Sequence, residues 1–176
     1  MSLEIPEALL NLESNCGIYA VWMIFQHYGI QMDIERLKDA CQYDEEDGTF
    51  GIGLAVALAR FGFVVSFHTD TDPNVHEKEQ YCYQDAQALD IPIAEALSYQ
   101  ELRENVESGY FVIVFYDTLD GLGNHSLVYS IDETEISFFD HFDTMSVALF
   151  EQQRSAEGIC RQALVIDGRQ FMQRYS

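Results

Sequence analysis

The order of the hydrophobic patterns along the chain limits its fold more than any other feature. Apolar residues recur at helical spacing over residues 16–28, after residue 33 and over residues 51–61. Beyond residue 109 they form short runs instead, and these predict strands at residues 110–116, 125–131, 134–140 and 161–166. Helices first and a sheet second predict an α+β fold, with an N-terminal helical half packed on a C-terminal antiparallel sheet.

Residues with capping preferences mark the ends of the early helices. Asn15, a favoured N-cap residue, stands just before the first helix, and Gly29, which favours the end of a helix, stands just after it. A second helix is predicted to follow Asp33. The third helix is rich in alanine and leucine and is predicted to stop near Gly62.

The middle of the chain is predicted to leave the helical half and return to it. Residues 63–68 predict a strand, and the polar residues 69–87 predict an exposed excursion. Ser98 and Glu101 then have the spacing of a capping box, which predicts a helix that ends at Gly109.

A chain of 176 residues has the length of one ordinary domain. No linker or internal repeat divides it, so we expect a single domain over residues 1–176. Its helical half is predicted to comprise about residues 1–62 and 98–109, and its sheet half about residues 63–68 and 110–170.

The net charge of −21 bears on the choice of partner. The segment from residue 61 to residue 153 holds 18 Asp and Glu against two cations, Lys78 and Arg103. Such an excess repels polyanions, so we expect no nucleic-acid partner and no insertion into a membrane. The expected partner is a basic or neutral peptide or protein substrate, while the composition says nothing about oligomeric state.

The N-terminus and the hydropathy predict a cytoplasmic location. The first residues are acidic where a signal peptide would be basic. The longest apolar run, residues 111–116, is too short to span a bilayer.

The cysteines and histidines predict neither a metal site nor a cofactor. The four cysteines include no Cys-x-x-Cys pair, and the five histidines have no zinc-binding spacing. A chain of this length with four cysteines also does not suggest a disulfide framework.

Cys16 is the best candidate nucleophile in the sequence. It stands at the predicted start of a helix, where free N–H groups and the helix dipole favour a thiolate. Gly17 would let a substrate approach the backbone closely. The alternative is that Cys16 is only a small buried residue, as many cysteines are.

A thiolate nucleophile needs a base and a residue that orients the base. His125 opens a predicted strand and Asp140 closes the next one. If the two strands form a hairpin with residues 132–133 at its tip, His125 lies directly across from Asp140 on one face. A slip of one residue would instead make His141 the neighbour of His125.

A series of short motifs extends along nearly the whole chain. They are Asn15-Cys16-Gly17-Ile18-Tyr19-Ala20, Tyr28-Gly29-Ile30, Gly48-Thr49 with Gly53-Leu54, Gly62-Phe63, Gly109-Tyr110-Phe111-Val112-Ile113-Val114, His125-Ser126-Leu127-Val128, Ile131-Asp132 and Asp140. In this order they resemble the papain-like bacterial peptidases that remove double-glycine leaders from bacteriocins, and their standalone relatives. The resemblance implies a papain-like fold. It also implies that Cys16 is the nucleophile, His125 the base and Asp140 the residue that orients it.

The sequence departs from this family at the position of a residue that helps to stabilise the oxyanion. The family has a glutamine six residues before the cysteine, where its amide helps to hold the oxyanion, and this chain has Leu10. Asn11 and the backbone N–H of Cys16 are the remaining candidate oxyanion donors. Loss of one such donor lowers the rate by about 10²–10³-fold.

These features predict thiol-dependent hydrolysis of a peptide or other amide bond by a Cys-His-Asp triad. One alternative is a catalytically weakened relative that uses the same fold to bind peptides or other proteins, and Leu10 favours it. The other alternative is a thiol acyltransferase that uses the same triad.

Overall fold

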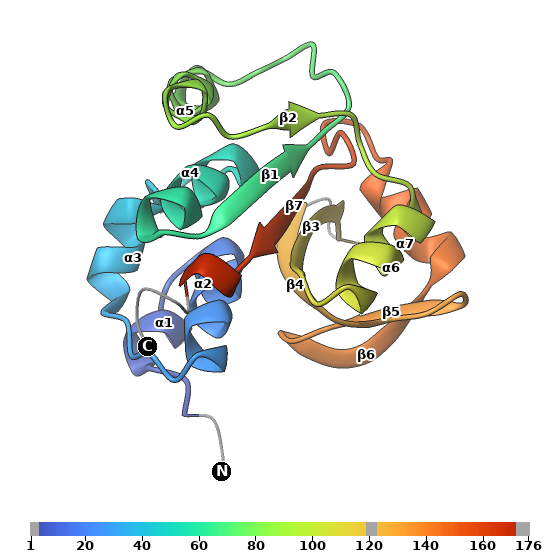
Figure 1. The fold of residues 1–176 in the computed structure, drawn as a ribbon, viewed down its shortest axis with the longest axis horizontal. Coiled ribbons are helices and arrows are strands. Elements are labelled where there is room, and N and C mark those ends of the chain that lie inside the picture. Colours follow the sequence, from blue (N-terminus) through green and yellow to red (C-terminus); the bar gives the residue numbers. More distant parts are fainter. Residues whose placement is uncertain (1–3, 119–122, 172–176) are drawn as a thin grey trace.

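The computed structural model describes residues 4–118 and 123–171 (Figure 1). The helices are α1 Glu7–Leu10, α2 Cys16–His27, α3 Ile34–Ala40, α4 Gly51–Phe61, α5 Glu77–Ala88, α6 Tyr99–Glu107 and α7 Val147–Arg154. The strands are β1 Val64–His68, β2 Ile93–Ala94, β3 Phe111–Asp117, β4 Gly123–Ile131, β5 Glu135–Phe138, β6 His141–Ser146 and β7 Ala163–Asp167. They form one seven-stranded sheet in the order β2-β1-β7-β3-β4-β5-β6. Apart from the parallel pair β1–β2, its neighbours are antiparallel, and the predicted α+β fold class is confirmed.

Helices cover both faces of the sheet, and each face has its own core. On one face Ile113 and Leu127 pack with the buried residues of α2 and α4. On the other face Val112 and Val114 pack with Leu102 of α6 and with α7. Since successive residues of a strand point to opposite faces, β3 contributes to both cores. The grouping of residues 98–109 with the N-terminal helices is therefore wrong, because α6 packs on the far face (Figure 1).

The predicted ends of the early helices agree closely with the structure. Helix α4 spans Gly51–Phe61 and stops at Gly62, whose φ of 110° lies in the left-handed region that favours glycine. The side chain of Asp33 accepts a hydrogen bond from the backbone N–H of Glu35 at the start of α3. Ser98 caps α6 by accepting from the N–H of Glu101.

The predicted exposed excursion over residues 69–87 is wrong in its second half, where α5 forms. His76 and Glu79 make a capping box at its start. Glu79, Cys82 and Ala86 are buried at helical spacing, and α5 packs on α4. The hydrophobic pattern of the sequence does not predict this helix, because its buried stripe is narrow and includes the carboxylate of Glu79.

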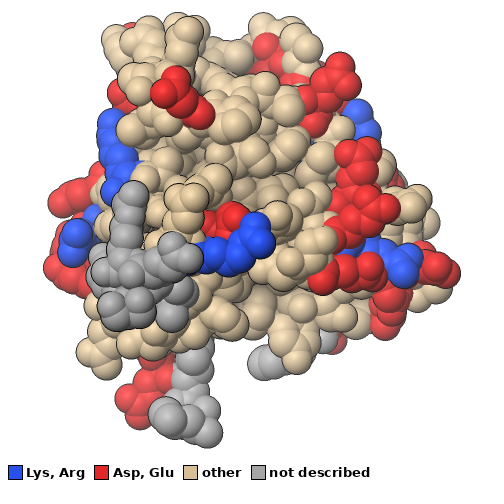
Figure 2. Space-filling model, viewed as in Figure 1, with Lys and Arg blue, Asp and Glu red and all other residues tan. Residues whose placement is uncertain are grey.

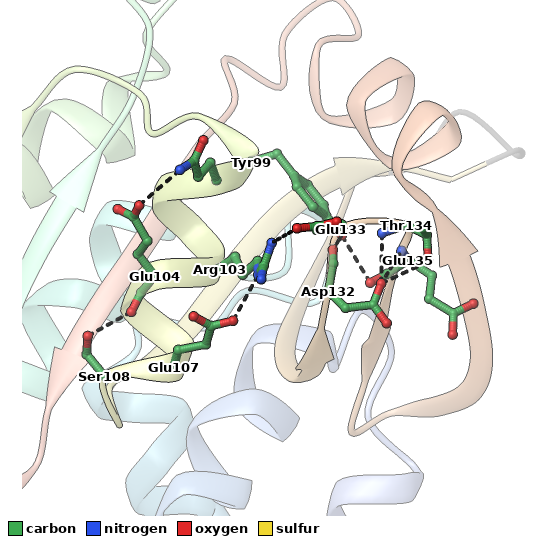
Figure 3. Close-up of polar contacts among 10 residues, drawn as sticks. Tyr99, Arg103, Glu104, Glu107, Ser108, Asp132, Glu133, Thr134 and Glu135 are labelled. Carbon is green, nitrogen blue, oxygen red and sulfur yellow. Dashed lines mark hydrogen bonds and ion pairs between the residues drawn. The ribbon is translucent and has the colours of Figure 1, made fainter.

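The tip of the β4–β5 hairpin is held by its own Asp132 and by α6. The Asp132 carboxylate accepts from the backbone N–H groups of Thr134 and Glu135. The hydroxyl of Tyr99 on α6 donates to the carbonyls of Asp132 and Glu135, and Arg103 pairs with Glu133 at 3.3 Å (Figure 3). These contacts put the turn one residue later than the predicted tip.

The register of this hairpin differs from the prediction as a result. Ile131 pairs with Ile136, and a bulge between Val128 and Ser130 then brings Val128 opposite Phe138. The predicted pairing of His125 with Asp140 is wrong by one residue, since this register brings residue 126 opposite residue 140.

Among the charged side chains on the face shown in Figure 2, acidic ones cover more of the surface than basic ones, and basic side chains lie beside acidic ones. Both cations of the acidic segment are engaged within the chain. Lys78 contacts Asp44 and Asp47 at 3.0 Å each, and Arg103 lies between Glu107 and Glu133 (Figure 3). No helix in the described part of the chain has the length and apolar character needed to cross a bilayer.

Candidate active site

Cys16 is the first residue of α2 and lies in a cleft of about 540 Å³. The side-chain amide of Asn15 donates to the carbonyl of Leu9 at 2.9 Å, which attaches the start of α2 to α1. The cleft is lined on one side by residues 46–50 and on the other by the beginning of β4, including His125. Cys16 is half-buried there, at the point where the two halves of the sequence meet.

His125 contacts Cys16 through its backbone. Its N–H donates to the Cys16 Sγ at 3.4 Å. This N–H is available because Phe115, the partner of His125 on β3, directs its own N–H to Gln162 near the start of β7. In an antiparallel pair that leaves the backbone groups of His125 pointing away from β3, toward Cys16.

The imidazole of His125 is buried, only 3% exposed, and stacks on Phe115 with ring centroids 4.3 Å apart. Its Nε2 has no hydrogen-bond partner among the described residues. Burial therefore lowers the pKa of His125 to about 4, because the charged form would lose its hydration.

Burial has the opposite effect on the thiol. It raises the pKa of Cys16, and the negative charge of Asp140 raises it further. The hydrogen bonds from the backbone N–H groups of His125 and Gly17 act against this but do not reverse it. Burial therefore favours the uncharged form of both the Cys16 thiol and the His125 imidazole.

Asp140 reaches this site through Ser126, whose hydroxyl donates to the Asp140 Oδ2 at 3.0 Å. The Ser126 oxygen lies 2.9 Å from the Tyr116 hydroxyl, and the Asn124 amide donates to both. No hydrogen bond between Asp140 and the His125 ring is found among the described residues. The charge of Asp140 therefore acts on the Cys16 thiol, but its carboxylate is hydrogen-bonded to Ser126, the residue after His125.

The space beside Gly17 is not open to a substrate, contrary to the expectation from sequence. A Cβ atom at Gly17 would lie 2.0 Å from the Oγ1 of Thr49. Gly17 is buried, and its missing side chain lets the loop before α4 pack against the start of α2. Thr49 Oγ1 is itself buried without a hydrogen-bond partner among the described residues.

The two positions considered for the oxyanion lie away from the cleft lining. Leu10 is 60% exposed, and Asn11 is exposed as well. Neither is among the residues that line the Cys16 cleft. The role of Asn11 stays a prediction, and the backbone N–H of Cys16 remains the nearer candidate donor.

The other three cysteines lie in unlike surroundings. Cys41 is fully enclosed, and its burial raises its pKa to about 12. Cys82 is buried on the inner face of α5, and Cys160 is half-buried among acidic residues that raise its pKa further. All four are free thiols, and only Cys16 lines the cleft that contains His125.

Sequence reasoning found Cys16, His125 and Asp140 but missed the residues that surround them. Ser126, Asn124 and Tyr116 gave no signal, since hydroxyl and amide residues are common in strands of every kind. Asn124 and Ser126 alternate with His125 along β4 and so lie on the opposite face, where Tyr116 of β3 pairs with Asn124. A correct register would have identified Ser126 as the partner of Asp140.

Comparisons with known proteins bear on the family resemblance and on the fold. The model of the peptidase C39 family matches residues 8–83, a segment that includes Cys16 but ends before His125. No curated protein matches the sequence. The resemblance to double-glycine leader peptidases is confirmed, and the family match supports a cysteine peptidase-like function.

Two solved structures share the fold. The peptidase domain of Streptococcus ComA, a bifunctional ABC transporter of a quorum-sensing pathway, has a TM-score of 0.54 and 16% identity, with 87% of this chain and 90% of that chain covered. A double-glycine motif protease from an AMS/PCAT transporter, solved with its leader peptide, has a TM-score of 0.54 and 12% identity, with 94% and 89% covered. At these identities the similarity establishes the fold.

Proposed function

With the similarity to peptidase C39 domains as the premise, we propose that this chain hydrolyses peptide bonds by means of the Cys16 thiol. The observation that carries the proposal is the position of Cys16 at the start of α2, half-buried in a cleft that His125 also lines. The cleft has a volume of about 540 Å³, within the range of ligand pockets, and residues from both halves of the chain form its walls.

In the proposed reaction His125 accepts the thiol proton as the Cys16 sulfur attacks the substrate carbonyl. His125 then returns the proton to the departing amine, which leaves a thioester on Cys16. A water molecule, deprotonated by His125, hydrolyses that thioester and frees the thiol. Asp140 is the third proposed residue, because its negative charge stabilises the imidazolium that forms during each transfer.

A non-catalytic peptide-binding role is the second candidate, and the electrostatics of the site favour it. Burial disfavours the charged forms of both Cys16 and His125, so the resting pair is not an ion pair. A binding module needs only the cleft, and such a site would keep the thiol inert.

The deciding experiment compares Cys16→Ala with Cys160→Ala on a mixture of peptides followed by mass spectrometry. We expect hydrolysis by the wild-type and Cys160→Ala proteins and none by Cys16→Ala, since Cys160 is a half-buried thiol outside the cleft. Equal hydrolysis by both variants would overturn the assignment of the nucleophile.

Alkylation with iodoacetamide separates the two candidate functions. In an enzyme the pH profile of Cys16 alkylation depends on His125 and changes in His125→Ala. In a binding module Cys16 reacts only at high pH, and the His125 substitution leaves the profile as it was.

A further inference from the structure

A second, smaller cavity opens from the Cys16 cleft. Its volume is about 130 Å³, and four residues line both spaces: Thr49, Phe50, Phe115 and His125. The remaining wall is formed by Gly51, Asp72, Glu79, Gly158 and Gln162. Phe115 and His125, whose rings are stacked, therefore face both spaces.

The polar lining of the side cavity holds acidic carboxylates and no Lys or Arg side chain. Glu79 is buried, and its carboxylate receives one hydrogen bond, from the N–H of His76 at 3.2 Å. Asp72 receives one from the N–H of Asn74 at 2.8 Å. Burial raises the pKa of Glu79 and the charge of Asp72 raises it further, so the two carboxylates lie within electrostatic reach of each other. Both carboxylates line the cavity, so a cation inside it would be attracted by both.

His125 provides an independent sign that a polar group is missing from this cavity. Its Nε2 is buried and has no hydrogen-bond partner among the described residues. A Cβ atom at Gly51 would lie 3.4 Å from this Nε2 and 2.9 Å from the Gln162 Oε1, so both atoms point to the same place. A polar group of the substrate that enters the cavity would lie beside these two atoms.

We propose that the side cavity binds a basic side chain of the peptide substrate, whose cationic group lies between the carboxylates of Asp72 and Glu79. This assignment rests on the proposed function and names its substrate class. The set of acceptors suits a guanidinium, which presents five donors in a rigid plane. A metal ion fits less well, because no three His, Cys, Asp or Glu side chains in the described part of the chain are gathered closely enough to hold one.

Two matched peptides test the assignment. Acetyl-Ala-Arg-Ala amide and its citrulline counterpart have nearly the same shape and differ in charge, and acetyl-Ala-Lys-Ala amide adds an ammonium. Each is titrated into the wild-type protein and into Cys16→Ala, which cannot turn a peptide over, while the His125 ring signals are followed by NMR. We expect saturable shifts with the arginine peptide and a Kd at least about tenfold weaker with citrulline.

Variants of the lining distinguish the cavity from general attraction by an acidic protein. Asp72→Asn and Glu79→Gln keep the shapes and the capping hydrogen bonds, and together they should remove the preference for arginine over citrulline. Glu46→Gln is the matched control, because Glu46 lines the main cleft but not the side cavity. It should retain the preference.

Equal affinity for arginine and citrulline, no saturable shift, or the same loss in Glu46→Gln would overturn the inference and leave water as the occupant of the cavity. The proposed function fails separately. A preference for arginine without any hydrolysis would refute the peptidase and keep the cavity assignment, whereas hydrolysis without a preference would do the reverse.

Discussion

The two faces of strand β4 treat their polar residues in opposite ways. On one face Asn124 and Ser126 join Tyr116 and Asp140 in a network in which Ser126 and Asn124 each have described hydrogen-bond partners. His125 stands between these two residues in the sequence and points to the other face. It is about as buried as Ser126, and its Nε2 has no described hydrogen-bond partner.

This difference separates residues that stabilise the strand from a residue that costs it stability. A satisfied network in a low-dielectric interior fixes the strand in place. An unsatisfied buried imidazole lowers the free energy of unfolding, and such residues are found mainly where they serve a function. The contrast predicts that substitutions on the two faces will act on different properties of the protein.

The largest expected effect is on activity. His125→Ala should lower kcat/KM by about 10³-fold or more, because the thiol loses its proton acceptor. Ser126→Ala, the adjacent substitution on the other face, should lower it less than about tenfold. Peptide hydrolysis measured on both purified variants decides the matter, and a larger loss in Ser126→Ala would reverse the assignment of the two faces.

Acid stability should distinguish the faces next. The pKa of His125 is about 4 in the folded protein against an ordinary 6.5, so the unfolded chain binds the proton first as the pH falls. Above about pH 7 the His125 imidazole is neutral in both the folded and the unfolded protein. Between pH 6.5 and 4 the wild-type protein loses about 3 kcal/mol of stability through this residue.

His125→Leu removes that loss. Urea unfolding at pH 7 and pH 4.5 should therefore show a smaller drop for His125→Leu than for the wild type. If both proteins lose the same stability over this range, the imidazole is not buried in its neutral form.

Hydroxyl deletions give the third contrast. Ser126→Ala removes the hydrogen bonds of its hydroxyl with Asp140, Tyr116 and Asn124 and should cost about 1–3 kcal/mol of unfolding free energy. Thr49→Val removes a buried hydroxyl that has no described partner and should be neutral or stabilise by about 1 kcal/mol. Chemical denaturation of the two variants provides the measurement, and a destabilised Thr49→Val would mean that its hydroxyl is bonded after all.

The smallest effect is expected at the surface, outside both faces. Arg103→Met removes ion pairs with Glu107 and Glu133, yet both acids are more than half exposed. The expected cost is below about 1 kcal/mol and should shrink in high salt. A cost that persists in 1 M salt would show that packing of α6 on the hairpin, rather than charge, is what Arg103 supplies.

The parts of the site that could be predicted are those that local signals determine. The sequence predicts Cys16 at the start of a helix from neighbouring residues alone: a residue suited to the N-cap precedes it, and apolar residues at helical spacing follow it. The position of His125 on a strand followed in the same way from a short apolar run.

The partner of Asp140 could not be predicted, because its position depends on distant parts of the chain. The turn is set by the Asp132 side chain and by the Tyr99 hydroxyl, which comes from another helix. The bulge after Val128 then moves the pairing by one residue. Helix α5 was missed for a similar reason, since burial of Glu79 depends on its packing against α4.

The bulge in β4 makes hairpin length a determinant of this site that residue identity does not reveal. Tyr129 is the extra residue on β4, opposite a single step on β5. One residue inserted between Phe139 and Asp140 would carry the carboxylate one position further along β4, from Ser126 to His125, without altering any residue of the proposed triad. Related chains whose hairpins differ by a single insertion or deletion would therefore hold the same three residues in different connections, and their spacing should be counted before their chemistry is inferred.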